Sequence, residues 1–195
     1  MNKCVSPCLI GINGGIGTGK SLICRMLRIL GYDVYDCDFH AKVLMDQSDD
    51  IKRQLSDNFG DIVSADGAID RKRLAAIVFA DAVRLQRLND IVHEAVRADL
   101  RQWVARQNRT CFVESAILYQ SGLDRVVTEV WEVTAPREIR LARVKKRDKS
   151  CENDIIRRME RQDEFHPECR HNRERLIVND DNQPLLPQIL RLLEL

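Results

Sequence analysis

Short runs of apolar residues, many of them β-branched, alternate along the chain with longer segments of helical periodicity. Polar residues bound each short run, so the runs predict strands. The predicted strands are residues 8–13, 33–36, 110–114, 127–134 and 176–179. Strands separated by helices favour an α/β fold with a five-stranded parallel sheet, because parallel neighbours need a crossover between them.

Between these strands, apolar residues recur at the spacing of one helix face. The predicted helices are residues 20–30, 39–45, 51–59, 71–79, 82–107, 137–147, 152–162 and 184–193, with a break expected inside 82–107. Gly31 is a C-cap signal for the first helix. The chain shows no internal repeat and no low-complexity linker. We therefore expect one domain, with ligands at the carboxyl ends of its strands.

A glycine-rich segment directly follows the first predicted strand. It reads Gly14-Gly15-Ile16-Gly17-Thr18-Gly19-Lys20-Ser21 and fits the P-loop pattern G-x-x-x-x-G-K-[ST]. Such glycines let backbone N–H groups and the following helix N-terminus wrap around a polyphosphate. Lys20 can then reach the β- and γ-phosphates, and the Ser21 hydroxyl can bind Mg²⁺. The segment predicts binding of a nucleoside triphosphate through residues Gly15, Ile16, Gly17, Thr18, Gly19, Lys20, Ser21 and Leu22.

Acidic residues follow two of the predicted strands. Asp36 and Asp38 lie where the second strand ends, near the crevice in which doubly wound sheets bind ligands. One of them can N-cap the next helix. The other can then orient an acceptor hydroxyl, accept its proton or contact Mg²⁺. Glu114 ends the third strand, where a Walker B carboxylate falls, although acids at strand ends are common.

Two segments have the pattern of insertions rather than of parts of the sheet. Residues 44–108 contain no convincing strand, only helical patterns with a turn around Asp66 and Gly67. They are either an acceptor-binding insertion or an extra helical layer. Residues 137–173 begin with a basic run that is either a solvated face or a mobile lid over the triphosphate, and we favour the lid. The basic residues of that run are Arg137, Arg140, Arg143, Lys145, Lys146, Arg147 and Lys149.

Composition fits a compact cytoplasmic enzyme. The 31 basic and 30 acidic residues nearly balance, so no bulk field recruits nucleic acid or an anionic membrane. No apolar run approaches the ~20 residues of a transmembrane helix, and the first four residues do not resemble the start of a signal peptide. The seven cysteines form no C-x-x-C pair, which indicates reduced thiols rather than a zinc site or a disulfide framework.

Together these residues resemble the dephospho-coenzyme A kinase family, over nearly the whole chain. That family's loop reads T-G-G-I-G-S-G-K-[ST], followed one strand later by D-A-D. Further matches are an apolar strand with P-L-L-[FY]-E-x-G, a lid helix ending in R-D, R-x-x-x-Q and I-[DN]-N. Here these motifs fall at residues 12–21, 36–38, 112–122, 143–148, 158–162 and 178–180.

The sequence departs from the family pattern at several positions. Asn13 replaces Thr, Cys37 the middle Ala, Ala116 the Pro, and Gln120 the Glu. The family's H-P pair reads His93-Glu94 here. Loss of the glutamate puts a charge-based role at residue 120 in doubt, and the roles of His93 and Gln120 stay open.

The resemblance implies a single P-loop kinase domain of sheet core (about 1–43, 109–136 and 174–195), helical acceptor-binding insertion (about 44–108) and lid (about 137–173). The implied reaction transfers the γ-phosphoryl group of ATP to the ribose 3′-hydroxyl of dephospho-coenzyme A, with Mg²⁺. It gives coenzyme A and ADP. Asp38 is then the base, and Asp36 and Glu114 have supporting roles. Lys20, Arg143 and Arg147 supply positive charge around the phosphates. The resemblance implies a monomer or a small homo-oligomer.

Two other functions compete with this one. A small-molecule or nucleoside monophosphate kinase of the same architecture would lack the D-x-D pair and the helical insertion in this order. A guanine-binding switch or adaptor would carry N-K-x-D after a late strand. The sequence reads Val178-Asn179-Asp180-Asp181 there, without a lysine, which disfavours a switch.

Overall fold

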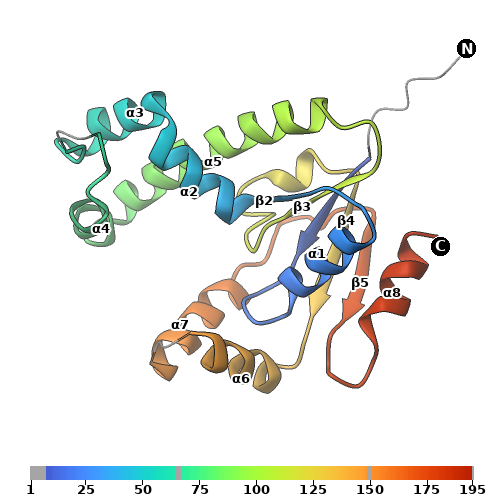
Figure 1. Cartoon of the computed structure of the whole chain (residues 1–195). Coiled ribbons are helices and arrows are strands. Elements are labelled where there is room, and N and C mark those ends of the chain that lie inside the picture. The colour runs from blue at the N-terminus through green and yellow to red at the C-terminus, as the bar shows by residue number, and fades with distance from the viewer. Residues whose placement is uncertain (1–7, 65–66, 149–150, 195) are drawn as a thin grey trace, which may run out of the picture. The chain divides into compact units, whose positions relative to one another are not determined.

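The computed structural model describes residues 8–64, 67–148 and 151–194. The chain forms two compact units (Figure 1). One consists of Met1–Tyr35 and Gln107–Leu195, and the other of Asp36–Arg106.

The first unit contains a five-stranded sheet with the order β2-β3-β1-β4-β5. β1 pairs in parallel with β3 and with β4, and β4 pairs in parallel with β5. The predicted α/β fold is confirmed. The strands are β1 (Leu9–Asn13), β2 (Val34–Asp36), β3 (Cys111–Glu114), β4 (Glu129–Thr134) and β5 (Glu174–Val178).

Helices of the first unit connect and cover these strands. One apolar cluster joins the buried Ile23 and Leu27 of the first helix and Ile189 of the last to strand residues such as Ile12 and Trp131. The first and last helices therefore pack on the same face of the sheet. The helices are α1 (Lys20–Ile29), α6 (Arg137–Arg147), α7 (Glu152–Asp163) and α8 (Leu185–Leu192), with a short 3₁₀ turn at Leu123–Arg125.

The second unit is helical and has its own core. Ile51, Leu55 and Phe59 pack there with Leu74 and Ile91 among other buried side chains. Each helix begins at a residue whose side chain accepts a hydrogen bond from a first-turn N–H, which satisfies a donor that would otherwise lack a partner. The helices are α2 (Cys37–Gln47), α3 (Asp49–Phe59), α4 (Arg71–Phe79) and α5 (Ala82–Ala105), capped by Asp36, Ser48, Asp70 and Asp81.

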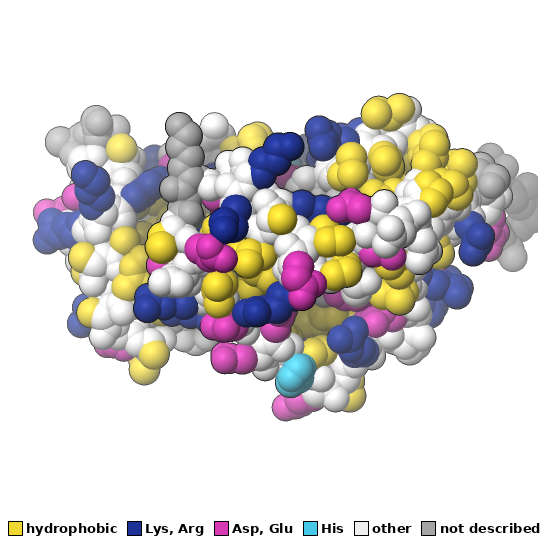
Figure 2. Space-filling model, turned by 90° about the horizontal axis from the view of Figure 1, so that it is seen from below, with side chains coloured by type: hydrophobic (Ala, Val, Ile, Leu, Met, Phe, Trp, Pro, Cys, Tyr) yellow, Lys and Arg dark blue, Asp and Glu magenta, His cyan; other side chains and the backbone are white. Residues whose placement is uncertain are grey.

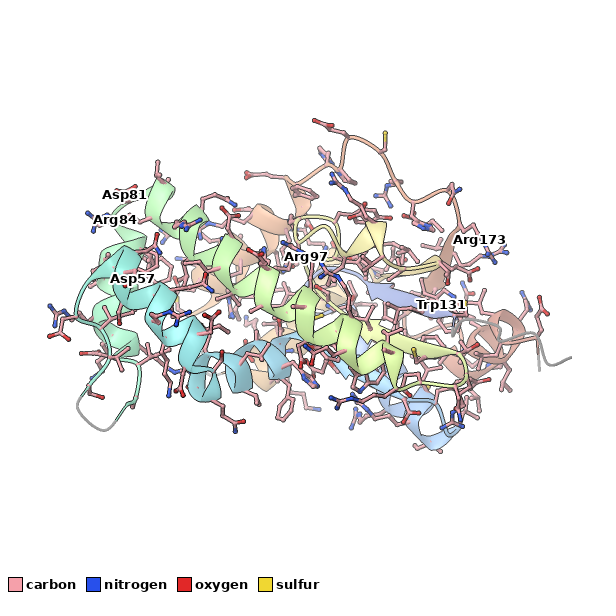
Figure 3. All side chains as sticks on the ribbon, turned by 90° about the horizontal axis from the view of Figure 1, so that it is seen from above. Asp57, Asp81, Arg84, Arg97, Trp131 and Arg173 are labelled. Atoms are coloured by element: carbon pink, nitrogen blue, oxygen red, sulfur yellow. The ribbon has the colours of Figure 1, made fainter. Side chains whose placement is uncertain are left out.

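The break expected inside residues 82–107 was wrong, since α5 is one continuous helix of 24 residues. Neither glycine nor proline interrupts it, and Ile91, Val96 and Leu100 are buried along it. The Asp81 carboxylate caps its first turn and also lies 3.5 Å from Nε of Arg84 (Figure 3). Strong capping and a continuous apolar stripe outweigh the polar residues in its middle.

Asp66 of the expected turn lies outside the described residues, and the flanking Val63 and Ile69 form an isolated antiparallel bridge. Within the described residues, no helix has the length and apolar character needed to cross a bilayer. The face drawn in Figure 2 carries basic and acidic side chains interspersed with apolar ones, as expected from a net charge of +1.

Candidate active site

The P-loop, residues 14–21, connects β1 to α1. Gly17 and Gly19 have φ angles of 81° and 99°, in the left-handed region that favours glycine. A Cβ atom at Gly17 would lie 2.6 Å from the Arg140 carbonyl oxygen. At Gly19 it would lie 2.2 Å from Nδ2 of Asn179. Both glycines are therefore required by backbone shape and by the close approach of their neighbours.

Lys20 is buried beneath this loop. Its Nζ donates hydrogen bonds to the carbonyl oxygens of Gly14, at 2.7 Å, and of Gly15, at 3.3 Å. The helix that starts at Lys20 has no side-chain cap at its N-terminus. Its first-turn N–H groups can therefore donate to anionic oxygens beside the lysine charge.

Ser21 and Glu114 meet at the carboxyl end of the sheet. The Ser21 hydroxyl donates to Oε1 of Glu114 at 3.1 Å. The parallel register that pairs Ile12 with Glu114 brings the end of β3 beside the start of the P-loop. A hydroxyl and a carboxylate are hard oxygen ligands, and Mg²⁺ in phosphoryl-transfer sites takes few protein ligands besides water and phosphate. The pair therefore fits a magnesium ion.

Asn13, the last residue of β1, contacts a carboxylate on β4. Its Nδ2 donates to Oε2 of Glu132 at 2.7 Å. Burial raises the pKa of the Glu132 carboxyl, the Asn13 hydrogen bond partly opposes this, and the nearby Glu174 adds to the rise. Asn13, which stands where the family has Thr, is thus a hydrogen-bond partner of Glu132.

Arg143 of α6 contacts the P-loop. Its Nη1 lies 3.4 Å from the carbonyl oxygens of Gly17 and Thr18. Its Nη2 donates to the backbone and side-chain oxygens of Asn179, both at 3.1 Å, and to Asp181. The structure thus brings Arg143 to the predicted phosphate site, where it joins the P-loop to the segment after β5.

Arg147 lies one turn further along α6 and is more exposed, at 61% of its side chain against 27% for Arg143. Its Nε donates to the adjacent Asp148 at 2.8 Å. The Arg147 guanidinium, and then that of Arg158, hold the pKa of Asp148 below its usual range. Arg147 therefore pairs with its neighbour in this structure, and Lys149 of the basic run lies outside the described residues.

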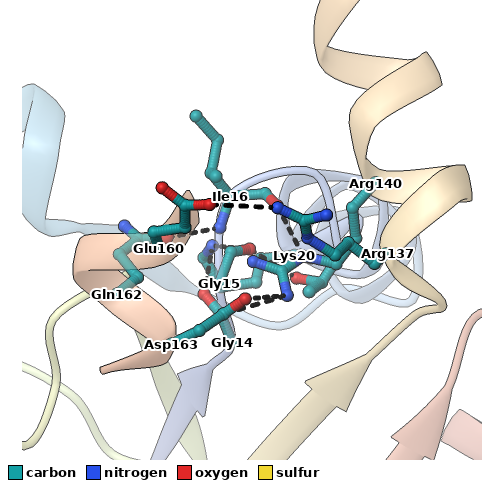
Figure 4. Close-up of polar contacts among 10 residues, drawn as sticks. Gly14, Gly15, Ile16, Lys20, Arg137, Arg140, Glu160, Gln162 and Asp163 are labelled. Carbon is teal, nitrogen blue, oxygen red and sulfur yellow. Dashed lines mark hydrogen bonds and ion pairs between the residues drawn. The ribbon is translucent and has the colours of Figure 1, made fainter. Parts of the chain in front are cut away.

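Three residues contact the P-loop without having been among the predicted site residues: Arg140, Gln162 and Asn179, whose Nδ2 donates to the Thr18 carbonyl at 2.7 Å. Arg140 donates through Nε to the Ile16 carbonyl at 3.0 Å, and Gln162 accepts from the Ile16 N–H at 2.7 Å (Figure 4). The Gln162 side chain is therefore the acceptor for the Ile16 N–H. The R-x-x-x-Q match was the one sequence signal for Gln162, and Arg140 stood out only as part of a basic run.

Asp36 and Asp38 begin the second unit. Asp36 is the N-cap of α2, and its Oδ1 accepts from the Phe39 N–H at 2.9 Å. Asp38 lies in the first turn of that helix and is exposed. Among the residues that the structure describes, its carboxylate makes no hydrogen bond or ion pair. The capping role therefore belongs to Asp36 and not to Asp38.

Two positions with open roles are also placed. His93 lies on α5, where burial lowers its pKa and the Arg97 charge lowers it further. Gln120 is exposed in the segment between β3 and β4.

Comparison with known proteins shows which family the chain resembles. The sequence profile of a family described as dephospho-CoA kinase matches residues 8–184. The dephospho-CoA kinase of Porphyromonas gingivalis is 36% identical over 186 residues, covering 95% of this chain and 92% of that protein. The enzyme of the same name from Chlorobaculum tepidum is 36% identical over 165 residues, covering 80% and 79%.

Solved structures share the fold. TT1252 from Thermus thermophilus superposes with a TM-score of 0.72 at 28% identity, covering 96% of this chain and 95% of that one. A shikimate kinase from Bacteroides thetaiotaomicron has a TM-score of 0.52 at 12% identity, over 96% of this chain and 99% of that one, and shows the fold alone. The family profile over residues 8–184, with 36% identity to the Porphyromonas gingivalis enzyme over 95% of the chain, places the protein in the dephospho-CoA kinase family.

Proposed function

We propose that the P-loop and its neighbours transfer the γ-phosphoryl group of ATP to the 3′-hydroxyl of dephospho-coenzyme A, giving coenzyme A and ADP. The reaction is that of the family. The observation that supports this assignment most strongly is the buried Lys20 below a left-handed glycine loop, with Ser21 and Glu114 in contact beside it.

Phosphoryl transfer passes through a loose transition state, so positioning and charge contribute more than covalent chemistry. The amino end of α1 and Lys20 hold the triphosphate, and Lys20 exchanges its loop carbonyl partners for phosphate oxygens. Arg143, already against Gly17 and Thr18, adds charge from α6. Arg147 reaches the transferring group only by leaving Asp148.

Mg²⁺ would be held by the Ser21 hydroxyl, with Glu114 binding it directly or through water. When bound, the ion neutralises charge developing on the phosphate oxygens. The carboxylate also holds the serine hydroxyl in place through their hydrogen bond.

Asp38 is the proposed base. The 3′-hydroxyl proton passes to its carboxylate as the new bond from oxygen to the γ-phosphorus forms. The bond from that phosphorus to the β–γ bridging oxygen breaks, and ADP leaves. The proposed acceptor-binding insertion (about 44–108) lies almost wholly in the second unit, whose first helix carries Asp38.

Coupled ADP release tests the acceptor. Dephospho-coenzyme A should support turnover, whereas AMP, CMP, shikimate and pantothenate should not. Lys20→Ala should abolish turnover without unfolding the protein, because the lysine is a point charge on the phosphates. Faster turnover with another acceptor would contradict the substrate, and near wild-type turnover of Lys20→Ala would contradict the P-loop mechanism.

A further inference from the structure

Ile16, in the middle of the P-loop, is held by hydrogen bonds from two helices. Its N–H donates to Oε1 of Gln162 on α7 at 2.7 Å. Its carbonyl accepts from Nε of Arg140 on α6 at 3.0 Å. Figure 4 shows both side chains converging on the loop. Both backbone groups of a loop residue are thus satisfied by side chains that lie more than a hundred positions away in sequence.

The Ile16 side chain is anchored as well. It packs against the apolar cluster that α6 and α7 form between them, whose buried members are Val144, Ile155 and Met159. An isoleucine at this position of the loop therefore belongs to the core of the two helices. The P-loop and the helix pair share this small hydrophobic core.

Arg140 is fixed in the orientation that this arrangement requires. It is only 9% exposed, and its Nη1 pairs with the Asp163 carboxylate at 3.0 and 3.2 Å. Its Nη2 lies over Gly15, 2.5 Å from where a Cβ atom would stand, and is buried without a hydrogen-bond partner among the described residues. A buried guanidinium N–H with no acceptor is costly. Its position beside the P-loop is one where an anionic oxygen would satisfy it.

We infer that Arg140 and Gln162 are positioning residues that set the nucleotide affinity of the P-loop through Ile16. A glycine-rich loop loses much conformational freedom when it closes on a ligand. Anchoring Ile16 on both sides restricts that freedom before ATP arrives, so binding costs less ordering. The inference rests on the proposed function only in that the P-loop binds a nucleotide.

The test measures ADP binding by calorimetry, which needs no acceptor. Gln162→Leu keeps the side-chain size and removes the acceptor for the Ile16 N–H. It should raise the ADP Kd about 10-fold, on the order of the one part-buried hydrogen bond that fixes the loop before binding. Arg140→Met should raise it about 10- to 100-fold, because a charged donor is lost. In turnover, KM for ATP should rise by similar factors while kcat changes less than about 3-fold.

Arg137→Met is the matched control. Arg137 joins the same two helices through Glu160, at 3.3 Å (Figure 4), but this pair is exposed, and the hydrogen bonds of the Ile16 backbone go to Gln162 and Arg140 instead. Its loss should leave the ADP Kd within about 2-fold of wild type, as is usual for surface pairs. The double variant Arg140→Met/Gln162→Leu should lose less than the product of the single effects, because both residues act on one peptide unit.

ADP affinities of Gln162→Leu and Arg140→Met equal to that of Arg137→Met would overturn the inference. A fall in kcat with unchanged Kd would do the same. If Arg140→Met does not fold, the half-buried Gln162 still decides the question. Wild-type protein that binds ADP without phosphorylating dephospho-coenzyme A would contradict the proposed function alone.

Discussion

At the scale of single residues, adjacent acids have separate structural and chemical tasks. The Asp36 carboxylate caps the first turn of α2, and Asp38, two positions later, is exposed. Lys20 and Ser21 likewise have separate proposed tasks, the phosphates for the lysine and the metal for the serine. In each pair the two side chains lie in different surroundings, so substitutions at neighbouring positions should have different effects.

Asp38→Asn should leave ATP affinity nearly unchanged and lower kcat about 10²- to 10⁴-fold, the usual span for loss of a general base. Asp36→Asn should cost much less, because asparagine also caps helices well. Steady-state kinetics with a separate ATP-binding measurement distinguishes the two. A strong rise in the ATP Kd with kcat preserved in Asp38→Asn would mean that Asp38 serves the metal and that another group is the base.

Glu132 should make folding stability depend on pH. Burial raises its pKa in the folded protein above the value in the unfolded chain. Folding therefore favours the protonated form. The stability from Glu132 is complete below the ordinary carboxyl pKa of about 4 and is lost as pH rises through the folded value. Glu132→Gln can still accept from Asn13, and it should have a higher Tm than wild type at pH 8 and an equal Tm at pH 4.

Thermal melts across this pH range provide the measurement. Glu168→Gln, an exposed loop glutamate, is the control and should not change the pH dependence. A Tm of Glu132→Gln at or below that of wild type at pH 8 would show that the ionised carboxylate is stabilised in the folded protein.

At the scale of elements, α6 presents its arginines to different surroundings. Arg140 and Arg143 lie against the P-loop, whereas Arg147 pairs with Asp148 at the helix end. The first turns of α6 already pack on the P-loop at Ile16 and Gly17. If α6 acts as part of a lid, we therefore expect its end to move more than its first turns.

Arg147→Ala should lower kcat about 10³-fold or more if this residue acts as an arginine finger on the transferring phosphoryl group. Arg158→Ala removes the other partner of Asp148 and should change kcat by no more than a few-fold. Single-turnover kinetics on both variants measures the chemical step. A small effect of Arg147→Ala on kcat, equal to that of Arg158→Ala, would mean that the basic residues at the end of α6 form a solvated face.

Most elements were predictable because their signals are local. The strand β1, the glycine loop and the start of α1 follow from apolar runs and one motif, and their bounds differ little from those expected. The start of α2 was less predictable, since Asp36 could end a strand or cap a helix and does both. The hydrogen bonds of Arg140 and Gln162 to Ile16 have no local signal in the sequence, because they join residues 124 and 146 positions apart.

At the scale of the whole molecule, the two units have separate cores and should respond to different ligands. The P-loop lies in the first unit, and the proposed acceptor-binding insertion (about 44–108) lies almost wholly in the second. ADP should therefore slow amide hydrogen exchange in peptides of residues 9–35 and 137–163. Dephospho-coenzyme A should slow it in peptides of residues 36–106.

Mass spectrometry of exchanged peptides locates the protection. Lys20→Ala serves as the control, since it should lose the ADP effect and keep the acceptor effect. Protection of the second unit by ADP alone, to the same extent as the first, would contradict this division of ligands.

Sulfur chemistry offers a practical use of one feature of the fold. Among the described cysteines, Cys24, Cys37 and Cys111 are buried, and burial raises the pKa of the Cys111 thiol to about 11. Cys151 and Cys169 are exposed and stand on either side of α7, the helix that carries Gln162. A maleimide dye should thus label these two positions faster than the buried cysteines, whereas Cys8 is half-buried and Cys4 lies outside the described residues. Its fluorescence could then report on the helix as nucleotide is added.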